Sequence, residues 1–350
     1  MNKKKILLAP LDWGLGHASR CIPVARQLQK HNFEVIFACS GRSLDLLINE
    51  FPNHHFIKLD DYNITYPKNG NMAWSMLAQS FKIWRGIVRE RSELDQIIND
   101  YNIDGVISDN RFGLYSKKIP SVFITHQLNI QSPILHKWIQ KINYRFIEKF
   151  DACWIPDYQN NLLSGNLTNT TLPKTKCHFI GSLSRFKKLK KTDDLEILAI
   201  ISGPEPQRTL FEKILKKQLI DSNKKSLLVL GKPEKNYEKQ IGNLKVVNHL
   251  NSTELNQAMM NTDVVLSRSG YSTVMDIAAL NKKAIFVPTP GQTEQIYLAK
   301  YYYDSKLTFA MHQHKFDLQI ALNEITNFKG LEGQKNETNW ENLFTLFKSK

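Results

Sequence analysis

The stretch LLAPLDWGLGHASRCIPVARQL, residues 7–28, contains the local pattern that decides the fold. An apolar run ends at Pro10. It is followed by Gly14 and Gly16, and apolar residues at helical spacing begin directly after these glycines. A strand, a glycine turn and a helix in this order form the first part of a βαβ unit. The glycines let the backbone approach a ligand, and the helix N-terminus attracts negative charge. His17 stands at this turn, and we predict a chemical role for it.

Short β-branched runs and helical patterns alternate along most of the 350 residues. This alternation predicts an α/β protein with parallel, helix-covered sheets in two doubly wound halves. Strands are predicted at 4–10, 33–39, 55–60, 104–109, 120–126, 151–156, 177–182, 195–203, 225–231, 244–250, 263–270 and 283–288. Helices are predicted at 17–31, 42–50, 74–100, 133–150, 206–219, 252–261, 271–281 and 293–305.

The length and the 42% hydrophobic content are sufficient for two cores, so we expect two domains. The basic stretch SRFKKLKKTDD has no apolar periodicity and is predicted to be the hinge. A solvated linker without any binding role is its alternative interpretation. The last segment has apolar residues at helical spacing and should form a helix that packs back on one of the domains. The predicted segments are 1–183 (N-terminal domain), 184–194 (hinge), 195–330 (C-terminal domain) and 331–350 (terminal helix).

The charge and the cysteines narrow the function classes. The chain has 47 Lys+Arg against 33 Asp+Glu, and its net charge of +14 favours an anionic partner. Because zinc-finger spacing and RNA-binding motifs are absent from the sequence, we expect that this partner is not a nucleic acid. The four cysteines show no Cys-x-x-Cys spacing and are predicted to be free thiols. The first apolar run is too short for a signal peptide or a membrane span, and we expect a cytoplasmic protein.

The opening loop differs from the dinucleotide-binding pattern. A nicotinamide or flavin enzyme would place a third glycine or an alanine at position 19 and an acid at the end of the second strand. Ser19 stands at the first position, and the second strand ends in ACSGR, where Arg42 could read only a 2′-phosphate. We therefore favour a different phosphate-bearing ligand.

The stretch SRSGYSTVMDIAALNKKAIFVPTPGQTEQIYLA, residues 267–299, is the most specific one in the second half. It predicts a strand, a turn and a helix whose N-terminal N–H groups suit a diphosphate. Asp276, one turn into the helix, could accept hydrogen bonds from sugar hydroxyls, or could simply stabilise the helix dipole. Glu294 and Gln295 start the next helix on the same side, where an exposed capping Glu is the alternative. The predicted diphosphate-binding residues are Arg268, Ser269, Gly270, Ser272 and Thr273.

These motifs together resemble the GT-B glycosyltransferases of family 28, which holds the peptidoglycan lipid II transferase that uses UDP-N-acetylglucosamine. The similarity is strongest over residues 7–28 and 263–300, and the chain particularly resembles a group of uncharacterised bacterial and archaeal UDP-GlcNAc transferases. The resemblance implies two Rossmann-like domains that face a cleft, and an inverting transfer from a UDP-sugar, GlcNAc or a related hexose. A sugar-nucleotide epimerase of the same fold and a non-catalytic donor-binding subunit are the alternatives.

The resemblance also implies roles for single residues. Gly14, Gly16 and His17 would lie near the donor phosphates and the acceptor, Asp276 would bind the ribose, and Glu294 and Gln295 the donor sugar. In the loop SGPEPQR, Gly203 and Arg208 would lie near phosphate. The segment THQLN, which contains His126, is similar to the family's His-Glu-Gln loop but lacks the Glu.

The expected chemistry needs no bound metal or cofactor. The chain has no Asp-x-Asp motif, so helix dipoles and N–H groups would stabilise the leaving UDP. A displacement at the anomeric carbon needs a base for the acceptor hydroxyl, and His17 and His126 are the candidates.

The acceptor side is assigned to the N-terminal half. Residues 72–100 and 133–150 mix aromatic and apolar residues with lysines and arginines, which suits the surface of an anionic bilayer if these side chains are exposed, and a core if they are not. We therefore expect a glycan or lipid-linked acceptor of the cell envelope and a peripheral position on the inner face of the plasma membrane. The residues are Trp74, Phe81, Trp84, Ile87, Trp138, Ile142 and Phe146, with Lys82, Arg85, Arg89, Arg91, Lys137, Lys141 and Arg145.

Overall fold

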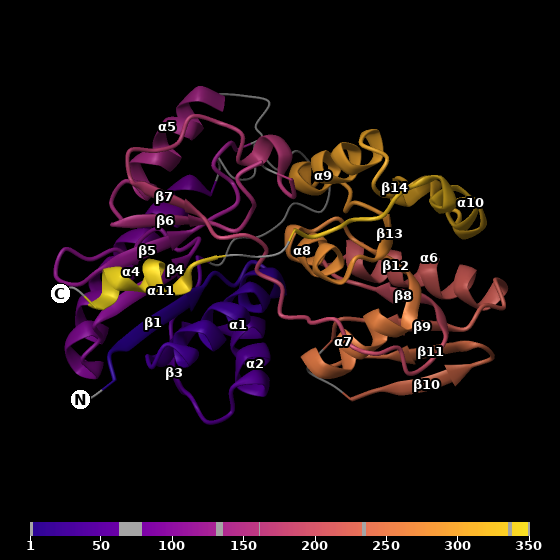
Figure 1. The fold of residues 1–350 in the computed structure, drawn as a ribbon, viewed down its shortest axis with the longest axis horizontal. Coiled ribbons are helices and arrows are strands. Elements are labelled where there is room, and N and C mark those ends of the chain that lie inside the picture. Colours follow the sequence, from indigo (N-terminus) through magenta and orange to yellow (C-terminus); the bar gives the residue numbers. More distant parts are fainter. Residues whose placement is uncertain are drawn as a thin grey trace. The chain divides into compact units, whose positions relative to one another are not determined.

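A computed structural model describes residues 3–62, 79–130, 136–160, 162–232, 236–334 and 338–348. The chain forms two compact units. Unit 1 comprises Met1–Leu183 and Lys335–Lys350, and unit 2 comprises Ser184–Gln334. The predicted hinge, 184–194, is grouped with unit 2. Each unit is built on one sheet with helices packed on it (Figure 1), so the predicted α/β class is confirmed.

All strand pairs described for the sheet of unit 1 are parallel. The sheet starts from the central strand β1, adds β2 and β3 on one side, and adds β4 to β7 on the other. Its strands, in spatial order, are β3 (His55–Lys58), β2 (Glu34–Cys39), β1 (Lys5–Pro10), β4 (Gly105–Asp109), β5 (Ser121–Ile124), β6 (Ala152–Ile155) and β7 (Lys176–Phe179). The helices described for unit 1 are α1 (Leu15–Lys30), α2 (Gly41–Glu50), α4 (Ser80–Tyr101), α5 (His136–Ile147), η1 (Gly165–Leu167) and α11 (Trp340–Lys348).

The sheet of unit 2 has the same plan, with one antiparallel pair at its edge, β10 with β11. Its strands, in spatial order, are β10 (Glu238–Ile241), β11 (Leu244–Val247), β9 (Ser226–Val229), β8 (Leu195–Ile200), β12 (Thr262–Ser267), β13 (Lys283–Phe286) and β14 (Phe309–Ala310). Its helices are α6 (Gln207–Asp221), α7 (Ser252–Asn261), α8 (Tyr271–Leu280), α9 (Thr293–Asp304), η2 (Gln313–Lys315), α10 (Leu318–Glu324) and η3 (Ile325–Asn327).

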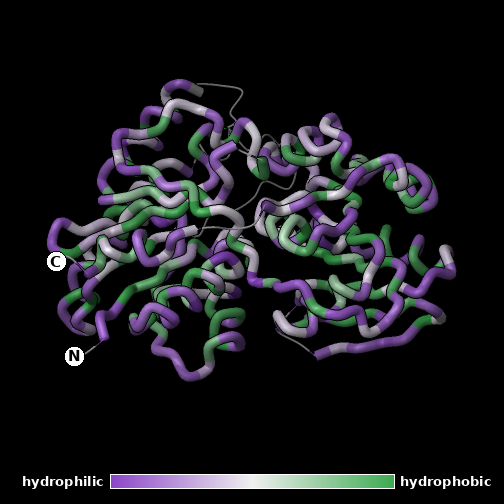
Figure 2. The backbone as a smooth tube through the Cα atoms, viewed as in Figure 1, coloured by the Kyte–Doolittle hydropathy of each residue, from purple (hydrophilic) through white to green (hydrophobic). Residues whose placement is uncertain are grey.

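The predicted strands and helices agree with these elements where the structure describes them. Predicted residues 74–78 and 133–135, and with them Trp74, lie outside the described residues. Two edge strands, β10 and β14, and the short helix α10 were not predicted. The sequence of β10, EKQI, is largely polar and exposed, so it has no apolar alternation to identify it. Figure 2 shows the contrast between the hydrophobic central strands of unit 2 and the hydrophilic β10.

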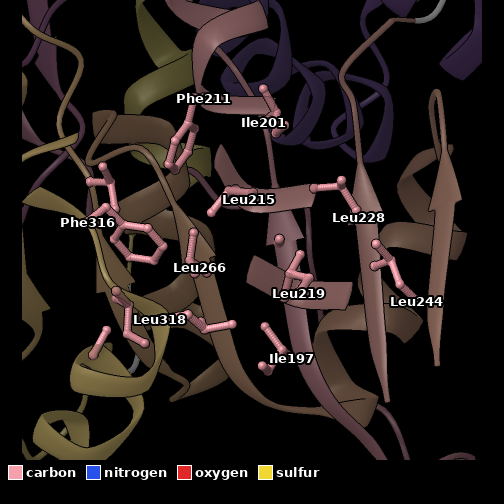
Figure 3. Close-up of a cluster of buried hydrophobic side chains, with 14 of the residues drawn as sticks. Ile197, Ile201, Phe211, Leu215, Leu219, Leu228, Leu244, Leu266, Phe316 and Leu318 are labelled. Atoms are coloured by element: carbon pink, nitrogen blue, oxygen red, sulfur yellow. The ribbon is translucent and has the colours of Figure 1, made fainter. Parts of the chain in front are cut away.

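The main core of unit 2 lies on one face of its sheet (Figure 3). Every second residue of β8, beginning at Ile197, points to this face, as the period of a strand requires. Helix α6 covers these residues with Phe211, Leu215 and Leu219, which lie one helical turn apart. Phe316 and Leu318 pack on the same cluster. This packing holds β8 and β12 side by side and so fixes the loops that follow them.

Unit 1 is covered on one face of its sheet by α4, whose Leu94, Ile97 and Ile98 pack on β1, β2 and β4. The terminal helix α11 packs on residues of the same unit. Its Phe344 makes an edge-to-face contact with Phe33, 5.5 Å between ring centroids. A Cβ at Gly105 would lie 2.4 Å from the ring of Phe347, so glycine is needed for this close approach. The C-terminal segment thus completes the core of the N-terminal unit.

A fully buried ion pair connects α4 to the end of the sheet. Nε of Arg111 donates to Glu90 across 2.8 Å, and neither side chain is exposed to solvent. Glu90 also accepts from the hydroxyl of Tyr62 (2.7 Å) and from N–H of Gly113 (3.0 Å). Arg111 donates to the carbonyl of Pro10, the last residue of β1. The pair therefore fixes α4 against the edge from which the opening loop departs.

Candidate functional site

The strand order of each unit reverses direction at one point, where two loops leave the carboxyl edge of the sheet on opposite sides. In unit 1 this point lies between β1 and β4, and in unit 2 between β8 and β12. Pro10 pairs with Asp109 and Ser267 with Ile200, so each pair of strands ends at the same level. Ligands of open α/β sheets bind at such points. The predicted site residues lie on the loops that follow these strands.

The opening loop is shaped by one glycine and fixed by one carboxylate. Gly14, the residue before α1, has φ +103°, a conformation that favours glycine. Asp12 accepts from N–H (3.1 Å) and Oγ (2.8 Å) of Ser43 at the start of α2. A Cβ at Gly41 would lie 2.0 Å from Asp12 Oδ2. Because Asp12 occupies this helix start, the loop is held in place independently of any ligand.

His17, in the first turn of α1, lies against a buried carboxylate. Its Nδ1 is 3.0 Å from Oδ1 of Asp109 at the end of β4. The side chain of Asp109 is fully buried, whereas that of His17 is 14% exposed. Asp109 was not among the residues predicted from the sequence. Its signal was its place as the last residue of a predicted strand, at the edge where His17 was expected.

Arg20, one turn after His17 on α1, was also missed. Its Nε donates to Oδ2 of Asp109 and its NH2 to Oδ1, each across 2.6 Å. The same NH2 lies 2.6 Å from Nδ1 of His17, and NH1 lies 3.4 Å from Nδ1 of His126. Arg20 is therefore in contact with both predicted histidines and with the carboxylate between their strands.

The pKa values of Asp109 and His17 are both lowered at this buried centre. Burial alone would raise the pKa of Asp109, but the charge of Arg20 and then the contacts with His17 outweigh it and lower that pKa to about 2. Burial, followed by the charge of Arg20, lowers the pKa of His17 against the opposing effect of Asp109. At neutral pH, Asp109 is thus ionised and His17 is an uncharged imidazole.

His126 is less suited to act as a base than the sequence suggested. It follows β5, next to β4, but it is only 4% exposed. Its Nδ1 lies beside the guanidinium of Arg20. Since a base must reach an acceptor hydroxyl, the greater exposure of His17 favours it over His126 for this predicted role.

In unit 2 the loops after β8, β12 and β13 lie on neighbouring strands and bring predicted residues together. Ser269 Oγ donates to the carbonyl of Gln295 (2.7 Å), and N–H of Thr289 donates to Oε1 of Gln295 (2.8 Å). A Cβ at Gly203, whose φ is +102°, would lie 3.4 Å from Oγ1 of Thr289. Thr289, which was not predicted from the sequence, is 1% exposed, and among the described residues its Oγ1 has no hydrogen-bond partner. A buried, unsatisfied hydroxyl beside a glycine loop is suited to bind a polar ligand.

The N-terminus of α8 is suited to an anion. It begins after Gly270, and within the described part of the chain no side chain caps it. Ser272 and Thr273 in its first turn are half-buried, as is Glu294 at the start of α9. The phosphate interpretation of this turn remains a prediction.

Two predicted donor residues have structural partners. Arg268 is fully buried, with NH1 donating to the carbonyl of Val287 (2.9 Å) and NH2 to Oε1 of Gln313 (2.6 Å). Burial lowers its pKa to about 9, and it lies over the ring of Phe211. The sequence motif did not show that this side chain points into the core, so we reassign Arg268 to holding the loops in place. Arg208 is paired with Glu205 at 2.7 Å.

Asp276 lies on α8, as predicted, but it already has a partner within unit 2. Its Oδ1 accepts from Oγ of Ser184, across 2.7 Å. Burial raises the pKa of Asp276 to about 6, against the lowering effects of Arg185 and Ser184. The carboxylate therefore also fixes the start of the predicted hinge, and a sugar hydroxyl would have to share it.

Part of the chain matches a known protein family. Residues 197–344 match the C-terminal domain of glycosyltransferase family 28. The chain is a glycosyltransferase with a family 28 C-terminal domain. The resemblance stated from the sequence is thereby confirmed.

Two relatives extend the similarity beyond this domain. An uncharacterised glycosyltransferase of Methanosarcina acetivorans is 24% identical over 320 residues, which cover 83% of this chain and 81% of the relative. The UDP-N-acetylglucosamine–N-acetylmuramyl-(pentapeptide) pyrophosphoryl-undecaprenol N-acetylglucosamine transferase of Actinobacillus pleuropneumoniae serotype 5b is 26% identical over 334 residues, 92% and 89% of the two chains.

A solved structure supports the fold of the whole glycosyltransferase. The crystal structure of MurG from Acinetobacter baumannii matches with a TM-score of 0.56 and 16% sequence identity, and covers 99% of this chain and 100% of its own. At this identity the match concerns the fold, which is GT-B.

Proposed function

We propose that this glycosyltransferase moves a sugar, GlcNAc or a related hexose, from a UDP-sugar to a hydroxyl of a lipid-linked or other cell-envelope glycan, with inversion. The observation that carries the proposal is the geometry of His17, which is partly exposed and lies 3.0 Å from the fully buried carboxylate of Asp109, at the point where the strand order of unit 1 reverses. The family 28 domain and the name of the Actinobacillus relative support the choice of donor and acceptor.

In the proposed mechanism His17 takes the proton of the acceptor hydroxyl. That oxygen forms a bond to the anomeric carbon while the bond from this carbon to the UDP oxygen breaks, which inverts the centre. Asp109 orients the ring through Nδ1 and stabilises the imidazolium as it forms. The N-terminus of α8 and the loop at Gly203 stabilise the negative charge of the leaving UDP.

The donor assignment predicts a ligand effect on unit 2. UDP should raise the melting temperature, and Asp276→Ala should weaken UDP binding by about 1–3 kcal/mol because hydrogen bonds to the ribose are lost. Since the pKa of Asp276 is about 6, the carboxylate is protonated below that pH, and UDP affinity should fall as the pH decreases through 6. Calorimetric titrations at pH 5 and 7.5 measure both effects. Equal affinity in the variant and the unchanged protein would remove Asp276 from the ribose site.

We further propose that no metal ion takes part. Transfer should persist in EDTA, because helix N-termini and N–H groups are expected to stabilise the leaving diphosphate. The measurement is UDP release from UDP-GlcNAc, with a polyprenyl-linked glycan as acceptor, before and after EDTA. Activity that EDTA abolishes and Mg²⁺ or Mn²⁺ restores would refute this part. A C2 epimer formed from UDP-GlcNAc alone would instead identify an epimerase.

An aromatic surface on unit 1 supports a membrane-borne acceptor. It consists of Phe81, Trp84 and Val88 on α4 and Trp138 and Ile142 on α5, all 49–69% exposed. Arg85 lies over the ring of Phe81, 5.6 Å from its centroid. Single exposed apolar residues are ordinary, but five on two helices beside basic residues suit an anionic lipid surface. Ile87 and Phe146, by contrast, pack in the core. No described helix is both long and apolar enough to cross a bilayer.

The aromatic surface makes a binding prediction. The protein should sediment with phosphatidylglycerol vesicles and much less with phosphatidylcholine vesicles. Trp84→Ala together with Trp138→Ala should weaken this binding at least about tenfold, because two exposed aromatic side chains that would insert into the lipid surface are lost. Ile320→Ala, which removes a 50% exposed side chain of unit 2, is the matched control and should bind as before. Equal sedimentation of the double variant would exclude this surface.

A further inference from the structure

Arg20 makes the closest contacts around the proposed catalytic base. It follows His17 by three residues, one helical turn, and its side chain is 3% exposed. Two of its nitrogens bind the two oxygens of Asp109 separately, each across 2.6 Å. Such a two-point pair fixes both the position and the charge of the carboxylate.

The same guanidinium and carboxylate both reach one ring nitrogen. Nδ1 of His17 lies 3.0 Å from Oδ1 of Asp109 and 2.6 Å from NH2 of Arg20. A neutral ring satisfies one of these contacts at a time, because Nδ1 either carries a proton and donates to Asp109 or has a lone pair and accepts from Arg20. Catalysis by Nε2 requires the first arrangement, which leaves the lone pair on Nε2.

The charges around His17 determine whether its imidazole is uncharged when the substrate binds. Among the described residues, the charged and titratable groups in contact with this centre include Arg20 and Cys21 from α1, Asp109 from β4, and His126 from the loop after β5. A buried Asp109 without a cation would favour the imidazolium, which cannot accept a proton. The guanidinium at 2.6 Å opposes this by placing a positive charge beside both groups.

We propose that Arg20 is a positioning residue: its guanidinium neutralises Asp109, so that Asp109 orients the ring of His17 without converting it to the imidazolium. This inference rests on the proposed function, in which His17 is the base. This role of Arg20 is distinct from stabilising the fold, because the guanidinium sets the pH range in which His17 is uncharged and can accept a proton.

The pH dependence of transfer tests this assignment. Arg20→Met keeps a long apolar stem but removes the charge, so the acidic limb of the kcat/KM profile should move upward by at least one pH unit, a tenfold loss of rate on that limb. Asp109→Asn removes the opposing charge and should move the limb downward. Arg20→Lys, which keeps the charge, should lie close to the unchanged protein. A limb that stays in place in Arg20→Met, with only the melting temperature lowered, would show a purely structural role and overturn the proposal.

A second measurement does not depend on catalysis. In protein with ¹³C-labelled histidine, NMR should show His17 of the unchanged chain titrating below 6.5 and that of Arg20→Met titrating at least one unit higher. If the unchanged His17 titrated above 6.5, the proposal would be wrong even where Arg20→Met fails to fold. The two proposals can fail separately. If NMR shows these titrations but His17→Ala keeps full activity, His17 is not the base, whereas the effect of Arg20 on the charge of His17 is still supported.

Discussion

His17→Ala is expected to lower transfer by about 10²- to 10⁴-fold, the range for loss of a general base. UDP binding should stay nearly unchanged, because most of the proposed donor residues, Asp276 and the N-terminus of α8 among them, belong to unit 2. Folding should change little, since the side chain is partly exposed and Asp109 retains its two bonds to Arg20. Single-turnover transfer, calorimetry with UDP and thermal melting measure the three quantities.

The controls for this variant use the distribution of tryptophan. All six tryptophans lie in unit 1, so intrinsic fluorescence reports the folding of the unit that contains His17. His55→Ala, which removes an exposed histidine from β3 of the same unit, should transfer at the normal rate. If His17→Ala instead melted early but retained full specific activity, His17 would be a packing residue and the proposed mechanism would be wrong.

Glu90→Ala is expected to destabilise unit 1 by about 3–5 kcal/mol, the typical effect of removing one partner of a buried ion pair. The reason is that Arg111 would remain fully buried with its charge uncompensated, and that the hydroxyl of Tyr62 and N–H of Gly113 would lose their acceptor. Denaturant unfolding followed by tryptophan fluorescence measures this change in unit 1.

Glu93→Ala, on the same helix, provides the matched comparison. Its carboxylate faces Arg89 at 3.7 Å on the surface, with 36% of the Glu93 side chain exposed. Surface pairs of this kind contribute about 0.5 kcal/mol or less, so this variant should unfold almost as the unchanged protein does. A similar loss for Glu90→Ala and Glu93→Ala would contradict the role assigned to the buried pair.

Much of the fold could be predicted from the sequence because it depends on local patterns. Apolar runs such as those of β1 and β4 are buried on both sides, and the helices between them repeat apolar residues every turn, so order and type of the elements follow from spacing alone. The polar edge strand β10 has no such pattern. Its position depends on pairing with β11, a contact between strands.

The glycine loops were predictable for a similar reason. A turn that approaches a ligand needs residues without a side chain. Gly14 and Gly203, which both have positive φ, can therefore be recognised from the sequence alone. Arg268 shows the limit of this reasoning. Its position beside a phosphate-type loop is visible in the sequence, whereas the direction of its side chain, into the core, depends on the packing of Phe211 and the carbonyl of Val287.

By itself, the sequence determined the fold class, the resemblance to family 28 and the two loops, one in each unit, that carry the predicted site residues, since each depends on residues close together in the chain. Only the tertiary structure decided that His17 lies against Asp109, that Arg20 binds the same carboxylate, and that His126 lies beside the guanidinium of Arg20. Asp109 is 92 residues from His17. The two meet because β1 and β4 are neighbours in the sheet, and strand order is set by long-range packing that no local pattern records.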